Sequence, residues 1–481
     1  MMINELKNYA LNGFYDESVD MDNTPRDSSE QLFNGLSHLS FKDLQELKNQ
    51  ADKTIAQMGI SFTVYSDKGN IDRLWPFDLF PRIISGEDWS EISMGLKQRL
   101  KALNMFIEDV YNDQAIFKTG LIPEAVILSS KDYRPECKGM KLKHASWASV
   151  CGSDLVRAGD GEVYVLEDNL RVPSGVSYML ENRAVMKQVM PELFQDINIM
   201  PIDQYPTNLL AMLRSLSPND EPNPEVVVLT PGIFNSAYYE HAYLAHEMGA
   251  ELVEGSDLVV KDDDCVYMRN VEGLKKVDVI YRRIDDDFLD PEVFNKDSTL
   301  GVKGLMRVWR AGNVAIANAP GCGVADDKVV YSYVPDMIRF YLNEEPLVKN
   351  VPSYLCGVKK DREYVLAHLN ELVVKPANES GGYGLLIGPH ASDEALGEFR
   401  QRIIENPRNY IAQPTLKLST VPTLCEDGLE GRHVDLRPFI LQGEMSYVTA
   451  GGLSRVALKK GSLVVNSSQG GGSKDTWIVK T

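Results

Sequence analysis

The order of strand and helix patterns between residues 226 and 253 limits the fold more than any other feature of this chain. An apolar strand over 226–230 is followed by the turn Pro231-Gly232, a helix over 236–248 and a strand over 251–253. Two strands that are joined through a helix lie parallel to each other. A further strand over 277–281 extends the pattern, so we expect the α/β (α+β) class.

The length and composition bound what kind of protein this is. A chain of 481 residues is long enough for two to four domains, and 43% hydrophobic with 25% charged residues excludes a disordered or fibrous chain. The net charge of −19 disfavours nucleic acid as a partner. No apolar stretch approaches 18 residues, and the N-terminus lacks a secretory apolar core, so we expect no membrane association.

The six cysteines are spread along the chain without a C-x-x-C pair. This spacing argues against a disulfide framework or a zinc cluster and favours reduced thiols in the cytoplasm. The sequence leaves open whether the protein forms a homo-oligomer or acts with a partner protein.

Other periodic segments indicate further elements. Helices are expected over 40–58, capped by Ser40, over 89–112, and after Asp326-Asp327. Strands are expected over 162–169, 371–376, 385–387, 410–413 and 433–440, and residues 466–477 are expected to form a Gly/Ser-rich tail.

A glycine-rich loop joins two of these strands. Lys375 precedes the loop 380–384. Glycines let main-chain N–H groups approach an anion, and a lysine adds a point charge for a phosphate. The chain has no P-loop motif, and this loop connects strand to strand, so the pattern predicts a hairpin lid over a nucleotide. Taken alone, it also fits an ordinary surface turn.

Glu167, Asp168 and Asn169 end a predicted strand. Side chains at i and i+2 share one face, so Glu167 and Asn169 point together while Asp168 points to the other face. Two oxygen ligands of this kind can hold Mg²⁺ beside substrate phosphates. Asp154, upstream, is a candidate third ligand. The alternative interpretation is a strand that runs out into a polar turn.

Two arginines near the C-terminus form a further candidate group. Arg437 lies beside a strand, and Arg455 follows a glycine turn. Arginine suits bidentate contact with a carboxylate or phosphate and suits an oxyanion that forms during acyl transfer. The alternative is a set of structural ion pairs in an acidic chain.

Two other polar groups carry less specific signals. His241 and His246 are five residues apart rather than the four of a helical zinc pair, so we interpret them as structural histidines. The acidic run 285–287 follows Arg282 and Arg283 at the carboxyl end of a strand, where α/β sheets present ligands.

Together these segments resemble the circularly permuted ATP-grasp family related to glutathionylspermidine synthetases, over roughly residue 76 to the end. The segments that carry the resemblance are 81–84, 167–169 with 173–175, 281–286, 325–328, 375–376 with 380–384, 419–420, 435–437 and 470–474. The resemblance implies a circularly permuted ATP-grasp fold with a Rossmann-like pre-ATP-grasp domain and an N-terminal helical extension.

The resemblance also implies domain boundaries. An N-terminal helical region would span 1–75, and a permuted ATP-grasp portion with the metal-ligand strand would span 76–220. The Rossmann-like substrate domain would cover 221–324. The nucleotide-binding portion with the glycine lid would cover 325–481.

Residue roles follow from the same resemblance. Lys328 and Lys375 match lysines that bind ATP phosphates, Gln413 lies at the adenine hinge, and Arg455 with Arg437 is catalytic. The lid residues that match are Ser380, Gly381, Gly382, Tyr383 and Gly384. The magnesium ligands that match are Asp154, Glu167 and Asn169. The candidates for binding the substrate are Arg171, Ser174, Arg282 and Arg283.

These roles imply an ATP- and Mg²⁺-dependent ligase that joins a carboxylate to an amine through an acylphosphate, with the lid excluding water. The resemblance implies no specific acid or amine. Two alternatives stay open: an inactive ATP-binding scaffold that acts with a partner protein, and a phosphotransferase built on the same fold.

Overall fold

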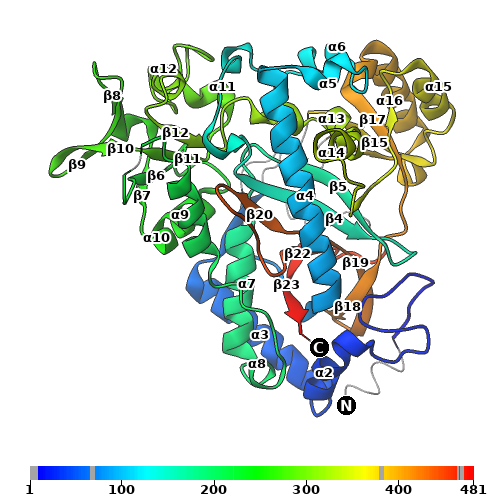
Figure 1. The fold of residues 1–481 in the computed structure, drawn as a ribbon. Helices are drawn as coiled ribbons and strands as arrows, with labels where there is room; N and C mark the ends of the chain where they lie inside the picture. Colours follow the sequence, from blue (N-terminus) through cyan, green and yellow to red (C-terminus); the bar gives the residue numbers. More distant parts are fainter. Residues whose placement is uncertain are drawn as a thin grey trace.

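The computed structural model describes residues 9–64, 71–219, 221–378, 384–462, 465 and 471–480 (Figure 1). A mixed sheet forms the centre of the protein, and its strands run in the spatial order β13, β5, β4, β19, β22, β23, β3, with β18 paired to β19 and the β20–β21 hairpin paired to β4. These strands are β3 (Phe77–Ser85), β4 (Val150–Arg157), β5 (Val163–Asn169), β13 (Lys349–Asn350), β18 (Thr420–Cys425), β19 (Gly428–Arg437), β20 (Phe439–Gln442), β21 (Ser446–Val448), β22 (Leu453–Val456) and β23 (Gly472–Val479).

This sheet brings distant parts of the chain side by side. The antiparallel β4–β5 pair, which carries the predicted metal ligands, lies next to β19, whereas β3 pairs in parallel with β23 at the other end of the sheet. Strands from the predicted 76–220 and 325–481 portions therefore share one sheet. The boundaries between those portions stay a prediction.

The prediction of a Gly/Ser-rich tail over 466–477 is wrong for its second half. Residues 472–479 form β23, and every residue of this strand is buried. Its polar side chains have buried partners: the Lys474 ammonium contacts Asp78, and the Asp475 carboxylate accepts a 2.7 Å bond from Arg183. Composition alone could not reveal these partners, which lie hundreds of residues away in the sequence.

The predicted parallel sheet is present. Its strands β12 (Ala315–Ala317), β11 (Val279–Arg282), β6 (Val226–Leu229) and β7 (Glu251–Val253) are all parallel. Beside it lie α9 (Tyr205–Ser215), α10 (Tyr238–Met248) and α12 (Leu305–Arg310) (Figure 1). An antiparallel group, β8 (Leu258–Val260), β9 (Val266–Asn270) and β10 (Gly273–Val277), projects from one end.

A third sheet carries Lys375. Its order is β14 (Tyr354–Leu355), β17 (Tyr410–Pro414), β15 (Leu372–Pro376) and β16 (Leu386–Ile387), and α15 (Lys359–Ala367) and α16 (Asp393–Glu405) lie beside it. The helices α13 (Lys328–Tyr331) and α14 (Val334–Leu342) form the connection that precedes this sheet.

The long amphipathic pattern forms α4 (Gly86–Tyr111), which begins three residues before the predicted start and crosses in front of the central sheet (Figure 1). The segment 40–58 forms α3 (Phe41–Met58) with the predicted Ser40 cap, and Asp43 closes a capping box. The other main helices are α2 (Asp27–Leu36) and α7 (Val176–Val189). Within the described residues, none of the helices combines the length and apolarity needed to cross a bilayer.

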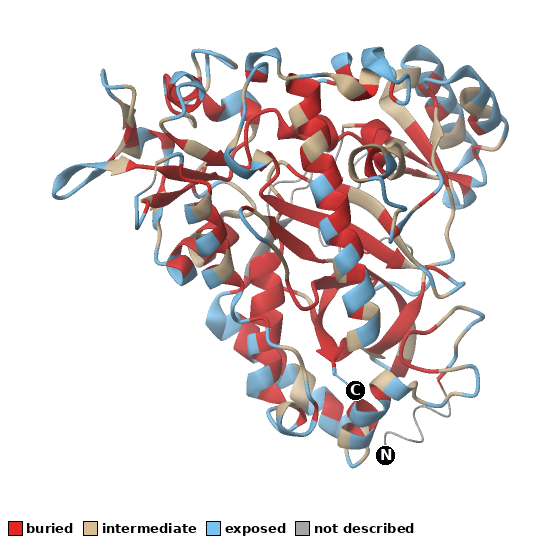
Figure 2. Ribbon diagram, viewed as in Figure 1, coloured by how far each residue is buried: buried red, intermediate tan, exposed pale blue. Residues whose placement is uncertain are grey.

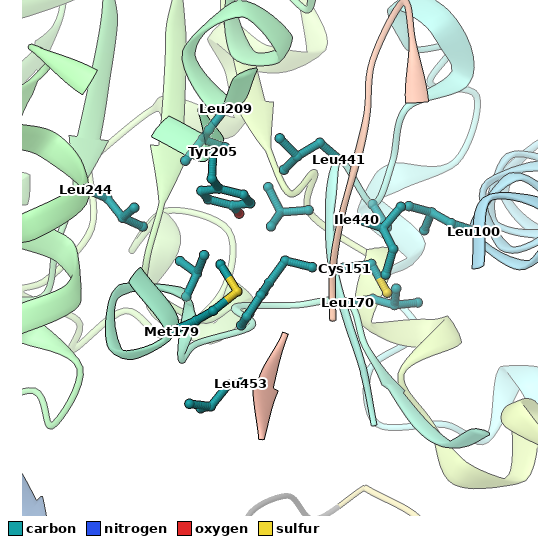
Figure 3. Packing of buried hydrophobic residues seen from close by; sticks show 14 of the residues in the cluster. Leu100, Cys151, Leu170, Met179, Tyr205, Leu209, Leu244, Ile440, Leu441 and Leu453 are labelled. Atoms are coloured by element: carbon teal, nitrogen blue, oxygen red, sulfur yellow. The ribbon is translucent and has the colours of Figure 1, made fainter. Parts of the chain in front are cut away.

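One hydrophobic core connects the central sheet to the parallel sheet. Figure 2 shows buried residues in the central strands and along one side of α4, with exposed residues on the opposite side. Figure 3 shows Leu100 of α4, Leu441 of β20 and Tyr205 of α9 in the same packed cluster. This continuous packing fixes the two sheets relative to each other.

Lys474 generates a stability prediction. Its side chain is fully buried, and its ammonium contacts Asp78 and donates 3.0 Å bonds to the carbonyls of Phe80 and Pro422. Lys474→Met leaves the Asp78 carboxylate buried without its cation, so we expect the free energy of unfolding in urea to fall by about 3–5 kcal/mol.

The matched control is Lys42→Met, since the Lys42 side chain is 84% exposed. This variant should change the free energy by less than about 0.5 kcal/mol. Equal effects of the two substitutions would contradict a buried ion pair in β23.

Candidate active site

The predicted carboxylate–amide pair at the end of β5 lies next to a lysine from a distant segment. Lys328 begins α13, and its Nζ lies 3.0 Å from the Glu167 Oε2. The Asp327 side chain caps this short helix by accepting from the Val329 N–H, and Arg408 holds the same carboxylate at 2.7 Å. The position of Lys328 is therefore set by buried polar contacts.

Lys375 on β15 lies near the same carboxylate. Burial lowers its pKa to about 8, and the charges of Glu167, Lys328 and Asp154 also act on it. Among the described residues, Lys375 forms no hydrogen bond or ion pair. A partly exposed ammonium without a direct partner among these residues is suited to receive an anionic ligand.

The Glu167 carboxylate stays ionised between these lysines. Burial raises its pKa, but the Lys328 and Lys375 ammonium groups outweigh this effect and bring the pKa below its usual value. Burial lowers the pKa of Lys328, and its contact with Glu167 reverses that shift. Glu167 and Lys328 are therefore both charged at neutral pH.

Asp168 occupies the opposite face of β5, as its position between Glu167 and Asn169 predicts. Its carboxylate accepts bonds of 2.8–2.9 Å from the Arg99 Nε of α4 and a 2.8 Å bond from Ser153. The Arg99–Asp168 pair is buried. This pair joins β5 to α4 and leaves the Glu167 face for the site.

The predicted catalytic arginines converge on Asp154. Arg437 donates to both carboxylate oxygens of Asp154, at 2.5 and 2.8 Å, and Arg455 donates to one of them at 2.7 Å. Arg455 also donates to Asp435 at 2.8 Å. Burial raises the pKa of Asp154, but the two guanidinium groups outweigh it and lower the pKa well below its usual range.

The three predicted magnesium ligands differ in whether their oxygen atoms are available to a cation. Glu167 and Asn169 fit a divalent cation: both present oxygens on one face, and the Asn169 Nδ2 donates to the Gly152 carbonyl at 3.0 Å, which leaves its Oδ1 as the outward atom. Asp154 does not fit, because both of its oxygens already accept from Arg437 and Arg455. Within the part of the chain that is described, no three His, Cys, Asp or Glu side chains form a metal cluster.

The predicted substrate residues lie on the side of the parallel sheet. The Arg283 guanidinium donates to the Pro173 carbonyl and the Ser174 hydroxyl at 2.8 Å, and it pairs with Glu240 at 3.0 Å. Arg171 is 25% exposed and pairs with Asp326 at 2.6 Å. Arg171 and Arg283 thus hold carboxylates of the chain itself.

Arg282 lies elsewhere than its predicted role requires. Its side chain is fully buried, it pairs with Asp286 at 2.7 Å, and it donates to the carbonyls of Asn318 and Ile284. A guanidinium enclosed and saturated in this way cannot reach a substrate, so Arg282 belongs to the packing of the parallel sheet. The spacing of Arg282 and Arg283 could not show which of these two buried arginines borders a cavity.

The remaining predictions concern the nucleotide. Gln413 on β17 is 2% exposed, and its Nε2 donates to the Ser353 hydroxyl at 3.0 Å. Gly384 ends the predicted lid with a φ of +67° and packs against Pro376. Ser380, Gly381, Gly382 and Tyr383 lie outside the described residues, so their role in a lid stays a prediction.

Sequence reasoning assigned no role to three polar residues that hold this site in place. Asp435 pairs with Arg455, Glu240 with Arg283, and Asp326 with Arg171. Asp435 and Asp326 lie inside segments that carry the family resemblance, so the resemblance could have pointed to them. Glu240 lies in an amphipathic helix, where nothing in the pattern distinguishes it from a surface acid.

The arginine–carboxylate cluster generates a second prediction. Asp154→Asn leaves Arg437 and Arg455 without the shared charge that compensates them, so the free energy of unfolding in urea should fall by about 3 kcal/mol or more. Asp160→Asn, in the turn of the same hairpin where the side chain is exposed, is the control. If both variants unfold at the same urea midpoint as the wild type, the cluster does not contribute to the stability of the fold.

Comparisons with known proteins agree with this arrangement. Residues 81–457 match the family described as circularly permuted ATP-grasp type 2. The fold is similar to a glutathione synthetase-like effector from Globodera pallida, with a TM-score of 0.59 and 13% identity over 92% of this chain and 98% of that one. At this identity the likeness concerns the fold alone.

Other relatives share more of the sequence than this structural neighbour does. An uncharacterized protein of Synechocystis sp. is 55% identical over 99% of both chains, and one of Mycobacterium tuberculosis is 47% identical over 97% of this chain and 84% of its own. A Frankia casuarinae protein, named as a candidate glutamate–cysteine ligase, is 43% identical over 98% of this chain but only 54% of its own length. The match over most of the chain shows that this protein belongs to the circularly permuted ATP-grasp type 2 family.

Proposed function

We propose that the protein is an ATP- and Mg²⁺-dependent ligase that joins a small-molecule or peptide carboxylate to an amine through an acylphosphate. The observation that carries this proposal is the convergence of Lys328, Lys375, Glu167 and Asn169 from three separate segments. Two lysines and two oxygen ligands around one point suit a nucleotide triphosphate with its divalent cation. The names of the Frankia and Globodera proteins support a ligase. We place the reaction in the cytoplasm, as the cysteine spacing predicts.

In this mechanism the lysines hold the phosphates of ATP. Lys328 is fixed by Glu167, whereas Lys375 has no such partner among the described residues and is the one whose charge the nucleotide would satisfy. Glu167 and Asn169 would hold Mg²⁺, which supplies positive charge to the phosphoryl group during its transfer. The loop 380–384 would cover the nucleotide and keep water from the acylphosphate.

Arg437 and Arg455 act on the substrate, on the same face of the central sheet as Glu167 and Asn169. Arg437 contacts both Asp154 and the Ser174 carbonyl, so it lies between the β4–β5 pair and the 172–174 loop. A guanidinium there can stabilise the oxyanion that forms when the amine attacks. Arg455 is held by two carboxylates and positions Arg437 through their shared partner, Asp154.

The central test is ADP release. We expect ADP formation to require both a carboxylate and an amine, screened from a panel of amino acids, dipeptides and polyamines. Lys375→Ala and Glu167→Ala should each lower the rate at least a hundredfold, because the first removes a positive charge from the phosphate site and the second removes a ligand that would hold Mg²⁺.

The matched control pair uses a similar contact outside the site. Lys349 lies 3.0 Å from Glu162 beside the same strand, and both side chains are more than half exposed. Lys349→Ala and Glu162→Ala should leave the rate unchanged. Full turnover in Lys375→Ala would contradict the proposal. A phosphorylated product that persists without amine would favour a phosphotransferase.

The lowered pKa of Lys375 predicts how ATP affinity depends on pH. Burial brings this pKa to about 8, so the ammonium loses its charge as the pH rises through 8. The affinity for ATP in the absence of other substrates should therefore fall about three- to tenfold between pH 7 and pH 9.

Titration calorimetry at several pH values measures this change. Lys375→Arg keeps the positive charge over the whole range, so its affinity should be independent of pH. A wild-type affinity that stays constant up to pH 9 would contradict a phosphate contact from a lysine with this lowered pKa.

A further inference from the structure

A cavity of about 170 Å³ lies at the carboxyl ends of β6 and β11. Its walls include Ser174, Asn235, His241, Arg283 and Asp285. The 172–174 loop separates this cavity from the nucleotide side, since the Ser174 carbonyl accepts a 3.3 Å bond from Arg437. The cavity is therefore one loop away from the residues proposed to act on the acylphosphate.

His241 is a buried polar side chain in the wall of this cavity. It is 1% exposed, and its Nδ1 lies 2.9 Å from the Thr230 hydroxyl. Its Nε2 forms no hydrogen bond with any described residue. The sequence indicated a structural histidine, and the contact through Nδ1 fits that role, but the second nitrogen is left for another partner.

The contacts of Thr230 determine which nitrogen of His241 carries the proton. The Thr230 hydroxyl oxygen accepts a 3.2 Å bond from the Gly232 N–H. The single proton of that hydroxyl has one acceptor among the described residues, the His241 Nδ1. Donation from Thr230 to Nδ1 is the arrangement that gives this proton an acceptor, and it places the proton of the neutral ring on Nε2.

The ring stays neutral under ordinary conditions. Burial and the nearby Arg283 guanidinium lower the pKa of His241 to about 2. The charge of Arg283 is itself compensated by Glu240. His241 is thus a hydrogen-bond donor at Nε2 and carries no charge.

Asn235 adds a second donor. Its Oδ1 accepts a 2.9 Å bond from the Ala237 N–H, so its Nδ2 has both protons available, and no described residue accepts them. Asp285, whose side chain is 46% exposed, provides a carboxylate in the same wall, and one of its oxygens lies 3.7 Å from the Arg171 guanidinium. Two N–H donors and one carboxylate complement a group that carries both an acceptor oxygen and an ammonium.

We propose that this cavity binds the non-reacting amino-acid end of the carboxylate substrate, with His241 Nε2–H and Asn235 donating to its α-carboxylate and Asp285 pairing with its ammonium. This inference deepens the proposed ligase function and rests on it for the statement that the ligand is a substrate. His241 selects the ligand by contact and takes no part in the transfer of the phosphoryl group.

The test is a binding experiment on the full chain labelled with ¹⁵N-histidine, without ATP. The nitrogen shifts of His241, assigned by loss of its signals in His241→Gln, should report a neutral ring protonated at Nε2. L-glutamate should shift these signals. Binding of 4-aminobutyrate, which lacks the α-carboxylate, and of glutarate, which lacks the ammonium, should be at least tenfold weaker.

Variants separate recognition from folding. His246→Gln lies on the same helix with an exposed side chain and should bind L-glutamate like the wild type. Asn235→Ala should weaken binding about tenfold, and Thr230→Val should remove the preference for the Nε2–H form, whereas Thr230→Ser should keep it.

The result that overturns the proposal is a ring protonated at Nδ1, or His241 signals that no probe shifts. Because ATP is absent, these results are independent of ligase activity. A protein that binds L-glutamate here but releases no ADP would contradict the proposed function and leave this site standing.

Discussion

The buried cluster of Asp154 with Arg437, Arg455 and Asp435 is the interaction on which the rest of the site depends. It crosses β4, β19 and β22, and β4 lies far from the other two strands in the sequence. Unpaired charges at these buried positions would be strongly unfavourable, so the strands must lie in this register for the cluster to form. The cluster therefore fixes the face on which Glu167 and Asn169 project.

Charged contacts continue from this cluster to the parallel sheet. Arg437 binds the Ser174 carbonyl, Arg283 binds the Ser174 hydroxyl, and Glu240 binds Arg283. Glu240 also accepts bonds from the N–H groups of Gly175 and Ser177, at the start of α7. The same polar network thus holds the face that carries Glu167 and Asn169 and the cavity around His241, which is the structural reason for proposing that the two ends of one substrate lie there.

The sequence predicted local structure better than it predicted which residues contact each other across the chain. Alternation along β5 correctly separated Glu167 from Asp168, because side-chain direction in a strand depends only on neighbouring positions. The burial of β23 and the enclosure of Arg282 depend on Asp78, Arg183 and Asp286, which periodicity does not link to them. The same limit explains why Asp154 was predicted as a metal ligand: its two arginine partners lie about three hundred residues away along the chain.

The central claim is that a nucleotide triphosphate binds between β5 and β15. The most direct measurement is a crystal structure of the full chain with Mg²⁺ and a non-hydrolysable ATP analogue. The account predicts phosphate oxygens within hydrogen-bonding distance of Lys328 and Lys375, and a metal ion bound by Glu167 and Asn169. A nucleotide bound at any other place, with Lys375 still unpartnered, would contradict it.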